Sequence, residues 1–319
     1  MLNVLVTGGA GFIGSHLVET LHSQGREVLV FDSFDDFYLP EVKRRNLELL
    51  KGRPGVTVVE GDIRDEALVE KVFSTHPIGV VVHLAARAGV RPSIAQPVLY
   101  SSVNVLGTTV LLEACRRHGV AKFIFGSSSS VYGNNAKLPF SEKDDVDRPI
   151  SPYAATKRAG ELLCATYHEL YRLNVFALRF FTVYGPRQRP EMAIHKFTRL
   201  IDRGLPLSRF GDGSTRRDYT YISDIIHGVL SAIERVQGFE IINLGGSQTT
   251  RLDELITLLE RHLNMKAIVE DEPGQPGDVV ATYADVDKAR RLLGYEPKVP
   301  VEEGLKLFVD WYRRLKVRA

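Results

Sequence analysis

Cysteine is scarce in this sequence, which has two cysteines, Cys115 and Cys164, among 319 residues. They show no paired spacing, and no histidine lies at ligand distance from either in the sequence, so neither a disulfide nor a metal site is predicted. Both fall within helical patterns, and we expect buried thiols. His83, His168 and His195 likewise fit no ligand motif, and we expect them to be structural rather than metal-binding or acid–base residues.

Long apolar runs and a strong charge of one sign are also missing. We find no apolar run near the roughly 18 residues that a membrane-spanning helix needs, and the segment MLNVLVTGG lacks the basic region and cleavage site of a secretory signal. Lysine and arginine number 41 against 39 aspartates and glutamates, for a formal net charge of +2. A nucleic-acid-binding protein typically has a larger basic excess. The sequence therefore predicts a cytoplasmic protein without a nucleic-acid partner and without membrane association.

Through the first 180 residues, short β-branched runs alternate with amphipathic stretches. The strand candidates are NVLVTG, EVLVFD, VTVVEGD, GVVVHLAA, KFIFGSSS and NVFALRF. Helices are predicted over 12–24, 40–51, 65–75, 97–119 and 152–172. This order is typical of an α/β protein with a doubly wound parallel sheet, the Rossmann fold, which binds ligands beyond the carboxyl ends of its strands.

From about residue 183 the sequence changes to longer loops rich in glycine, proline and arginine. Helices are predicted near 191–203, 222–236, 251–263 and 301–315. The run EIINLGG at 240–246 has the character of a strand that returns to the main sheet. Because 319 residues exceed the usual size of one compact core, we expect an NAD-binding Rossmann domain over 1–182. A smaller, interleaved substrate-binding region is expected over 183–319, with 222–246 returning to the first domain.

The stretch VLVTGGAGFIGSHL places Gly8, Gly11 and Gly14 three residues apart, between the first strand and the first helix. Glycines here allow a tight turn and close approach to a pyrophosphate, which the free N–H groups at the helix start can bind. Asp32 ends the second strand, where it can accept from a ribose 2′-hydroxyl and would repel a 2′-phosphate, which favours NAD over NADP. The alternative role for Asp32 is that of a capping residue. Asp62, after the third strand, is placed to reach the adenine.

The stretch SPYAATK combines a helix start with two groups that suit proton transfer. Ser151 suits the N-cap and Pro152 the first helical position. Tyr153 and Lys157 are four residues apart and share one helix face, where the lysine charge and the helix N-terminus both favour a tyrosinate. The serines of KFIFGSSSSVYG follow a strand and are placed to hold a substrate hydroxyl. In isolation, each motif is as typical of a surface helix or a polar loop.

Together, TGGAGFIG, HLAARAGVRPS, SSSSVYG and YAATK resemble the extended short-chain dehydrogenase/reductase family, along essentially the whole chain. The resemblance implies a tightly held NAD, a carboxyl-terminal region that grips a nucleoside diphosphate sugar, and a Ser-Tyr-Lys catalytic group. By motif position these roles fall on Ser128, Tyr153 and Lys157, with Ser129 and Ser130 as adjacent helpers; Lys157 would also hold the nicotinamide ribose. The implied cofactor contacts are Gly8, Gly11, Phe12, Ile13, Gly14, Asp32, Asp62, Ile63, Leu84, Ala85, Ala86 and Lys157.

The motifs also bear on which reaction the resemblance implies. Sugar dehydratases and uronate decarboxylases of the family usually carry an acidic residue where this sequence reads SSSSVYG. Without that acidic residue, the reaction that remains is oxidation of the sugar at carbon 4, followed by re-reduction on the other face of that carbon. RFFTVYGPRQRPEMAIHKF resembles the corresponding stretch of UDP-glucuronate 4-epimerases more than that of UDP-galactose 4-epimerases. We therefore expect conversion of UDP-glucuronate to UDP-galacturonate; a UDP-glucose or UDP-N-acetylglucosamine 4-epimerase, a nucleotide-sugar oxidoreductase or decarboxylase, and an NAD sensor remain alternatives.

An epimerase that acts on a uronate must prevent its 4-keto intermediate from losing carbon dioxide. Oxidation of glucuronate at carbon 4 gives a β-keto acid, which loses carbon dioxide when its carboxylate bond aligns with the carbonyl π system. A guanidinium can pin that carboxylate through two parallel hydrogen bonds, which a lysine cannot. Arg189 is the candidate, with Thr182 and Ser128 or Ser129 as neighbouring donors. The alternative is that Arg187 and Arg189 bind phosphate or lie on an exposed loop.

The rest of the nucleotide sugar is assigned by motif position. The diphosphate and uridine fall to GDGSTRRDYTYISD, with Arg217 as the main residue and Arg216 as a helper, and Arg91 of HLAARAGVRPS is also assigned to the substrate. Many relatives have an arginine just before the GD of PGQPGDV, where this chain has Gln275 and a proline. A second phosphate arginine is therefore not predicted, and Asp278 is assigned to the ribose.

The resemblance also implies an assembly. The family commonly dimerises through a four-helix bundle, which here would use the helices predicted over 97–119 and 152–172. The expected partners are a UDP-sugar and a second copy of the chain.

Overall fold

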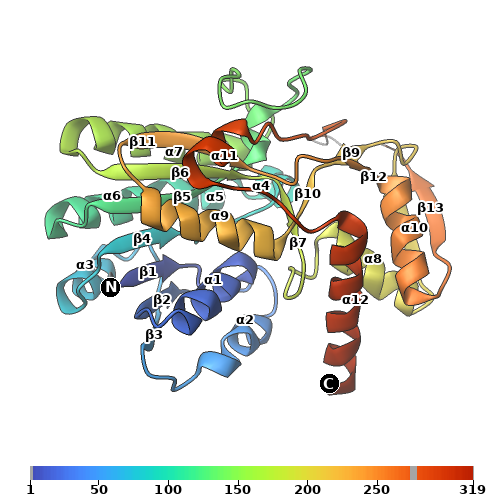
Figure 1. The fold of residues 1–319 in the computed structure, drawn as a ribbon, viewed down its shortest axis with the longest axis horizontal. Helices are drawn as coiled ribbons and strands as arrows, with labels where there is room; N and C mark the ends of the chain where they lie inside the picture. The colour runs from blue at the N-terminus through green and yellow to red at the C-terminus, as the bar shows by residue number, and fades with distance from the viewer. Residues whose placement is uncertain (1–2, 274–278, 319) are drawn as a thin grey trace.

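The computed structural model describes residues 3–273 and 279–318, and its centre is a seven-stranded parallel sheet (Figure 1). The strands lie in the order β11-β6-β5-β4-β1-β2-β3. They are β1 (Val4–Thr7), β2 (Val28–Asp32), β3 (Val56–Glu60), β4 (Val80–His83), β5 (Lys122–Ser128), β6 (Asn174–Phe180) and β11 (Phe239–Leu244). The chain leaves β1 toward β3 and then returns to β4 on the other side of β1, so a topological switch point lies between β1 and β4.

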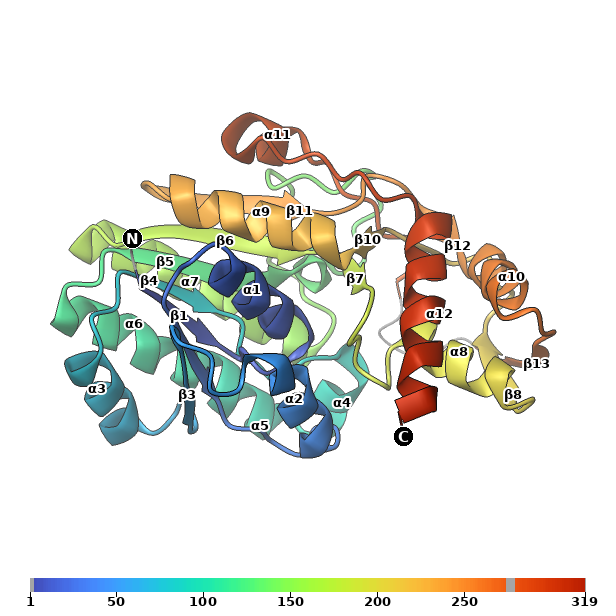
Figure 2. The same ribbon diagram turned by 60° about the horizontal axis from the view of Figure 1, so that its bottom comes forward.

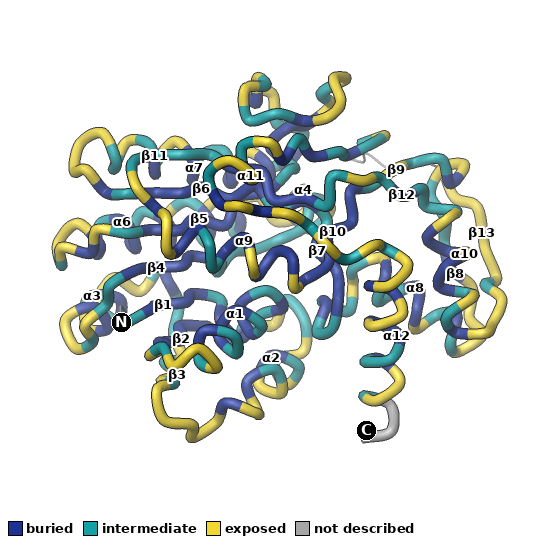
Figure 3. The backbone as a smooth tube through the Cα atoms, in the orientation of Figure 1, coloured by how far each residue is buried: buried dark blue, intermediate teal, exposed yellow. Residues whose placement is uncertain are grey.

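The sheet is covered on both faces, and this explains why its central strands read as unbroken apolar runs. Val4 and Val6 of β1 pack into one layer with α1 (Phe12–Ser23) and α9 (Ile222–Arg235), whereas Leu5 packs into the other. That second layer holds α3 (Glu66–Thr75), α6 (Gly107–His118) and α7 (Pro152–Tyr171). Figure 2 shows the two helical layers, and Figure 3 shows the buried strands between them. The predicted doubly wound α/β fold is confirmed.

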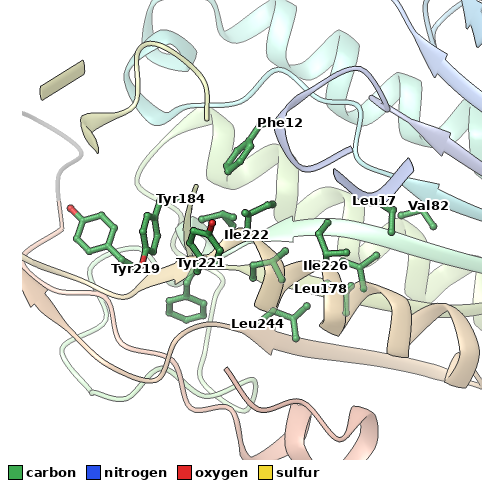
Figure 4. Packing of buried hydrophobic residues seen from close by; sticks show 14 of the residues in the cluster. Phe12, Leu17, Val82, Leu178, Tyr184, Tyr219, Tyr221, Ile222, Ile226 and Leu244 are labelled. Carbon is green, nitrogen blue, oxygen red and sulfur yellow. The ribbon is translucent and has the colours of Figure 1, made fainter. Parts of the chain in front are cut away.

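A second group of elements lies beyond the carboxyl ends of the strands, at the right of Figure 1. Its helices are α8 (Ala193–Asp202), α10 (Leu252–Leu263) and α12 (Val301–Arg318). Its strand pairs are β7 (Thr182–Tyr184) with β10 (Tyr219–Tyr221), β9 (Arg216–Arg217) with β12 (Thr250–Arg251), and β8 (Pro206–Phe210) with β13 (Ile268–Glu272). One apolar cluster runs from β1 through α9 to α12. The two parts therefore share a core, and Figure 4 shows Leu17 and Ile226 in this cluster with Tyr184 and Tyr221.

The helix boundaries differ from expectation in a few places. The helix predicted over 40–51 divides into α2 (Pro40–Asn46) and a 3-10 turn, η1 (Glu48–Leu50). Two short helices were missed, α4 (Val90–Ala95) and α11 (Asp287–Leu293), and a 3-10 turn, η3 (Ser129–Tyr132), follows β5. Each is too short to show an apolar periodicity in sequence.

The stretch 97–118 is long and apolar enough, by length and composition, to cross a membrane, with a mean hydropathy of 1.4. The expectation that no run approached that length was therefore wrong by this criterion. The stretch is built from α5 (Pro97–Ser101), a π-helical turn, η2 (Ser102–Leu106), and α6. It contacts α3 and α7 within the fold. The core helix of a globular protein has the same composition because it is apolar on most of its surface.

Candidate functional site

A cavity with a volume of about 610 Å³ opens at the switch point of the sheet. We call it the main cavity. Its walls come from the segments that follow β1, β2, β3, β4 and β5, together with the start of α7 and the loop after β7. Ligands of doubly wound sheets bind at this position because the strand order reverses there and leaves a crevice.

The turn between β1 and α1 is the one place at the main cavity where glycine is strictly required. Gly8 has φ +68°, and a Cβ added there would lie 2.7 Å from the backbone nitrogen of Ala85. A Cβ at Gly14 would lie 2.2 Å from the carbonyl oxygen of Gly8. Gly11 is the residue before α1 and makes no side-chain cap, so the first N–H groups of the helix lie beside the cavity without a side-chain acceptor at the cap. This arrangement suits a pyrophosphate.

Asp32 lines the main cavity and also fixes the turn beside it. Its carboxylate accepts hydrogen bonds of 2.9 Å from the backbone nitrogens of Ala10 and Phe34. Burial raises the pKa of Asp32, against the lowering effect of these bonds and of the Lys43 charge. The capping role and the cavity role that the sequence left as alternatives are thus combined in one side chain.

The remaining predicted cofactor residues also border the main cavity. Asp62 does so while its carboxylate pairs with the Arg64 guanidinium at 2.6 Å, and hydrogen bonding to Arg64 lowers the pKa of Asp62. The others lining the cavity are Gly8, Gly11, Phe12, Ile13, Gly14, Ile63, Leu84, Ala85, Ala86 and Lys157.

The sequence analysis missed a charged and aromatic wall of the main cavity that follows β2. Lys43, which is buried, donates to the side chain of Asp35 at 2.6 Å, and Arg87 pairs with the same carboxylate at 3.3 Å. Phe37 lies under Arg87, with the guanidinium 5.7 Å from the ring centroid, and Tyr38 also lines the cavity. The acidic and aromatic run DSFDDFY was the available signal, but its basic partners lie in other elements, Lys43 in α2 and Arg87 after β4.

The start of α7 brings the predicted catalytic group together. The Ser151 hydroxyl accepts from the backbone nitrogen of Ala154 at 3.1 Å, and Pro152 is the first helical residue, as predicted. This cap places Tyr153 in the first turn at the wall of the main cavity. Lys157, one turn later and 5% exposed, donates to the carbonyl oxygen of Gly126 in β5 at 2.7 Å.

Burial shifts the pKa values of both Tyr153 and Lys157. Burial raises the pKa of Tyr153, while a hydrogen bond with Ser128 and the charge of Arg189 lower it. Burial lowers the pKa of Lys157 to about 8, and the charge of Glu161 opposes that shift. Ser128 lines the same cavity. The three side chains can therefore share a proton with a hydroxyl that enters the cavity.

The predicted substrate residues divide between two cavities. Ser129, Ser130, Thr182 and Arg217 line a smaller cavity of about 150 Å³, whereas Ser128, Tyr153 and Arg189 line the main one. Arg91 is among the lining residues of neither cavity; its guanidinium lies 4.6 Å from the ring centroid of Phe210. Gln275 and Asp278 lie outside the described residues. The predicted contact of Arg91 with substrate is therefore unsupported by this arrangement.

Arg189 and Arg187 have different surroundings, although they are two residues apart. Arg189 faces the main cavity, with its Nε 3.1 Å from a carboxylate oxygen of Glu191 and its guanidinium 5.6 Å from the ring centroid of Phe37. Arg187 turns the other way and pairs with Glu19 on α1 at 2.6 Å. Arg187 thus fixes the loop against the Rossmann part, and its predicted alternative roles as a phosphate ligand or an exposed loop residue do not fit.

The histidines have structural contacts. His83 is buried between the hydroxyls of Thr7, at 2.7 Å, and Thr108, at 2.9 Å, and burial lowers its pKa to about 3. His195 bonds with the backbone of Gln188 at 2.6 Å, and His168 with the Leu173 carbonyl at 2.8 Å. In the described parts of the chain, no group of three or more His, Cys, Asp and Glu side chains could hold a metal ion.

The sequence profile of a family described as GDP-mannose 4,6 dehydratase matches residues 5–308. The chain belongs to this family. Membership in it confirms the resemblance to the extended short-chain dehydrogenases/reductases that the motifs indicated.

Individual members of the family differ in the sugar on which they act. A UDP-glucuronate 4-epimerase from Thermodesulfobacterium geofontis is 43% identical over 308 residues, covering 96% of this chain and 95% of that protein. The Bacillus cereus UDP-glucuronic acid 4-epimerase, in complex with UDP-glucuronic acid and NAD, matches with a TM-score of 0.93 and 38% identity, covering 98% of this chain and 100% of that chain. The Thermotoga maritima UDP-glucose 4-epimerase with UDP-glucose has a TM-score of 0.91 and 37% identity, covering 99% and 100%. Because both kinds of epimerase share this fold, the side chains of the main cavity must decide between the sugars.

Proposed function

We propose that this chain is an NAD-dependent epimerase that inverts carbon 4 of UDP-glucuronate to give UDP-galacturonate. The observation that carries the proposal is the position of Arg189, whose guanidinium lines the same cavity as Tyr153 and lowers its pKa by its charge. A cation at this place suits a substrate with a carboxylate next to the reacting carbon. The relatives from Thermodesulfobacterium geofontis and Bacillus cereus support the same sugar.

The residues of the main cavity fit NAD. The turn that a Cβ at Gly8 or Gly14 would obstruct suits the pyrophosphate, and Asp32 and Asp62 suit the adenosine end. Lys157 would hold the nicotinamide ribose. When bound, NAD supplies a hydride acceptor that also returns the hydride, so that no cofactor is consumed.

The protein's own part in the reaction is proton transfer and positioning. Tyr153, as tyrosinate, takes the proton of the carbon 4 hydroxyl, and Lys157 stabilises the tyrosinate by its charge. Ser128, which shares a hydrogen bond with Tyr153, orients that hydroxyl. The 4-keto sugar turns, so that the hydride would return to the other face of carbon 4, and Tyr153 gives the proton back to the carbon 4 oxygen. The reaction is therefore balanced without net oxidation.

Arg189 has a second task once the 4-keto uronate has formed. A bidentate guanidinium holds the carboxylate out of alignment with the carbonyl π system, and this prevents loss of carbon dioxide. The Nε of Arg189 also lies 3.1 Å from a carboxylate oxygen of Glu191, so this guanidinium is held at the wall of the main cavity.

Product analysis with two sugars tests this assignment against the alternative of a neutral-sugar epimerase. Purified protein is incubated, without added NAD, with UDP-glucuronate and separately with UDP-glucose, and the products are followed by NMR. UDP-galacturonate should form at a kcat/KM well above that of any UDP-galactose. A preference for UDP-glucose would assign the chain to the neutral-sugar epimerases and leave Arg189 without its proposed task.

The smaller cavity is the proposed site for the diphosphate and uridine, within the region 183–319 that we assign mainly to the nucleotide sugar. Arg217 lines it, next to Asp218, a buried carboxylate that accepts from the backbone nitrogens of Gly246 and Ala284 at 2.6 and 3.0 Å. Asp218 thus joins three loops of this region and fixes the strand that carries Arg217. The cavity can grip the UDP group while the sugar turns in the main cavity.

If Arg217 binds the diphosphate, Arg217→Gln will raise KM for UDP-glucuronate about tenfold or more and change kcat little, because the lost contact is the same in the ground and transition states. Steady-state kinetics and calorimetric binding of UDP measure the effect. Arg203→Gln, a change at an exposed arginine just beyond α8 and away from both cavities, is the matched control. Unchanged UDP binding by the Arg217 variant would contradict the assignment.

We also propose that the chain forms a homodimer in the cytoplasm, with a four-helix bundle made by the stretch 97–118 and α7 of each copy. Apolar side chains gather on the outer faces of these helices. Val98 is 81% and Leu170 63% exposed, and Leu106, Leu162 and Tyr171 are exposed as well. A second copy would cover this surface with identical apolar residues, and such self-complementarity is what a two-fold interface requires.

Negative charges introduced on this surface should prevent two copies of the chain from associating. The double variant Leu162→Glu/Leu170→Glu is expected to elute as a monomer in size-exclusion chromatography with light scattering, whereas the wild type elutes as a dimer. Leu205→Glu, at an apolar residue that is 46% exposed outside these helices, is the control and should remain dimeric. A monomeric wild type would refute the proposed assembly.

A further inference from the structure

Beneath the catalytic group lies a fully buried carboxylate that the motifs did not reveal. Glu161 is one turn beyond Lys157 on α7 and is 0% exposed. Its oxygens accept hydrogen bonds from the Ser127 hydroxyl at 2.6 Å and from two nitrogens of Arg179 at 2.8 and 2.9 Å. Arg158 donates a longer bond of 3.3 Å. A buried carboxylate with this many donors is a fixed negative charge in a region of low dielectric.

The groups around Glu161 come from five elements. Arg179, on β6, is 1% exposed and lies with its guanidinium 4.8 Å from the ring centroid of Tyr132 in η3. Ser127 ends β5 beside the catalytic Ser128, and Cys164 follows Glu161 on α7. The other titratable groups that face the cluster are Lys157 and Arg158 on α7, Cys115 on α6, and Tyr132, while His83 on β4 and Tyr153 face Lys157. Arg158 also pairs with the exposed Asp147 at 3.3 Å, so Glu161 is the buried carboxylate among three cations, Arg158, Arg179 and Lys157.

We propose that Glu161 is a positioning residue of the epimerase, whose buried negative charge keeps Lys157 in its ammonium form against the carbonyl of Gly126. This inference rests on the proposed function, because it assigns Glu161 a part in the proton transfer of Tyr153. Glu161 touches neither cofactor nor substrate, since it is not among the residues that line the main cavity. It acts through Lys157.

Two opposing effects set the protonation state of Lys157. Burial favours the neutral amine and lowers the pKa of Lys157 to about 8, whereas the Glu161 carboxylate raises it. Without that carboxylate, desolvation would act unopposed, and the two arginines would add uncompensated positive charge. Lys157 would then lose its proton near neutral pH and with it the charge that stabilises the tyrosinate and the donor that holds Gly126.

The direction of the pH effect follows from the sign of the charge. Removing a negative charge lowers the pKa of every neighbouring group. Glu161→Gln, which keeps the shape of the side chain, should therefore move the alkaline limb of the kcat–pH profile to lower pH by roughly one to two units, as expected for the loss of a unit charge one helical turn away in a protein interior.

Two further variants separate this role from a purely structural one. Glu161→Asp keeps the charge and should retain the wild-type pH profile even if its melting temperature falls. Arg158→Gln removes a positive charge from a side chain that is 23% exposed, so it is expected to fold, and it should move the profile to higher pH. The measurement is kcat for UDP-glucuronate between about pH 5 and 10 for the wild type and the three variants.

The outcomes are distinct. A downward shift for Glu161→Gln, with no shift for Glu161→Asp, supports the proposal. A Glu161→Gln profile that superimposes on that of the wild type overturns it, as does an equal shift for Glu161→Asp. If Glu161→Gln does not fold, Arg158→Gln decides, because an unshifted profile there refutes the electrostatic role. Failure of the proposed function would appear separately, as a wild type without activity on UDP-glucuronate.

Discussion

Tyr153→Phe is expected to reduce kcat for epimerisation by about a thousandfold or more and to leave the binding of UDP-glucuronate within a few-fold of the wild type. The variant keeps the ring that lies edge-on to Tyr100, with ring centroids 6.3 Å apart, and removes only the hydroxyl that exchanges a proton with the substrate. General acid–base catalysis contributes about 10²- to 10⁴-fold, and here one group serves as both base and acid. Product formation by NMR and substrate binding by calorimetry measure the two effects.

Tyr100 offers a matched control for this prediction. Its hydroxyl donates to the Ala88 carbonyl at 2.7 Å and is not assigned to the chemistry. Tyr100→Phe should therefore retain most of the wild-type kcat. A Tyr153→Phe variant with substantial turnover would contradict the assignment of Tyr153 as the base, whatever the behaviour of the control.

Replacing Arg189 with lysine should lower kcat/KM for UDP-glucuronate about a hundredfold and release carbon dioxide from a fraction of the turnovers. Lysine keeps the charge but cannot form two parallel hydrogen bonds, and truncating one partner of a buried, hydrogen-bonded charge pair typically costs about 2–5 kcal/mol. The 4-keto uronate is then free to rotate its carboxylate into alignment with the carbonyl. Decarboxylation leaves a UDP-4-ketopentose, which NMR and mass spectrometry distinguish from UDP-galacturonate.

Arg203, an exposed arginine just beyond α8, supplies the control for Arg189→Lys. Arg203→Lys changes the same type of side chain away from both cavities and should leave rates and products unchanged. If Arg189→Lys retained the wild-type kcat/KM and formed no decarboxylated product, the carboxylate of the substrate would have to be held by another group.

The fold could be predicted from sequence to the extent that its strands are buried on both faces. β1, β2 and β4 are buried throughout and apolar up to their last residue, and the glycines and carboxylates that line the main cavity lie at or just beyond the carboxyl ends of the strands. The short strands beyond residue 182 are only two to five residues long, apart from β11, and have no such signal. These strands form by pairing between segments that are distant in the sequence. Such pairing leaves no pattern within either segment.

For the site, motif position predicted which residues line the main cavity where one local segment forms the wall, and it missed residues where two distant segments meet. Gly8, Gly14, Tyr153 and Lys157 belong to short continuous motifs. Arg187 and Arg189 look equivalent in sequence, and only the contact of Arg187 with Glu19 on α1 distinguishes them.

The pairing of charged side chains in the interior could not be predicted either. The i, i+4 spacing of Lys157 and Glu161 is visible in the sequence, but its meaning depends on Arg179 from β6 and Ser127 from β5. The same holds for Asp35, whose partners Lys43 and Arg87 come from different elements. Such pairs are set by tertiary packing, so the sequence pattern indicates neither their burial nor their charge balance.

The central claim is that carbon 4 loses its hydrogen as a hydride and regains the same hydrogen on the other face within one active site. Its most direct test is incubation of the purified protein, without added NAD, with UDP-glucuronate deuterated at carbon 4, followed by NMR of the product. We expect UDP-galacturonate that retains the deuterium at carbon 4, with none at carbon 5. Product with ordinary hydrogen at carbon 4, or no UDP-galacturonate at all, would contradict the account.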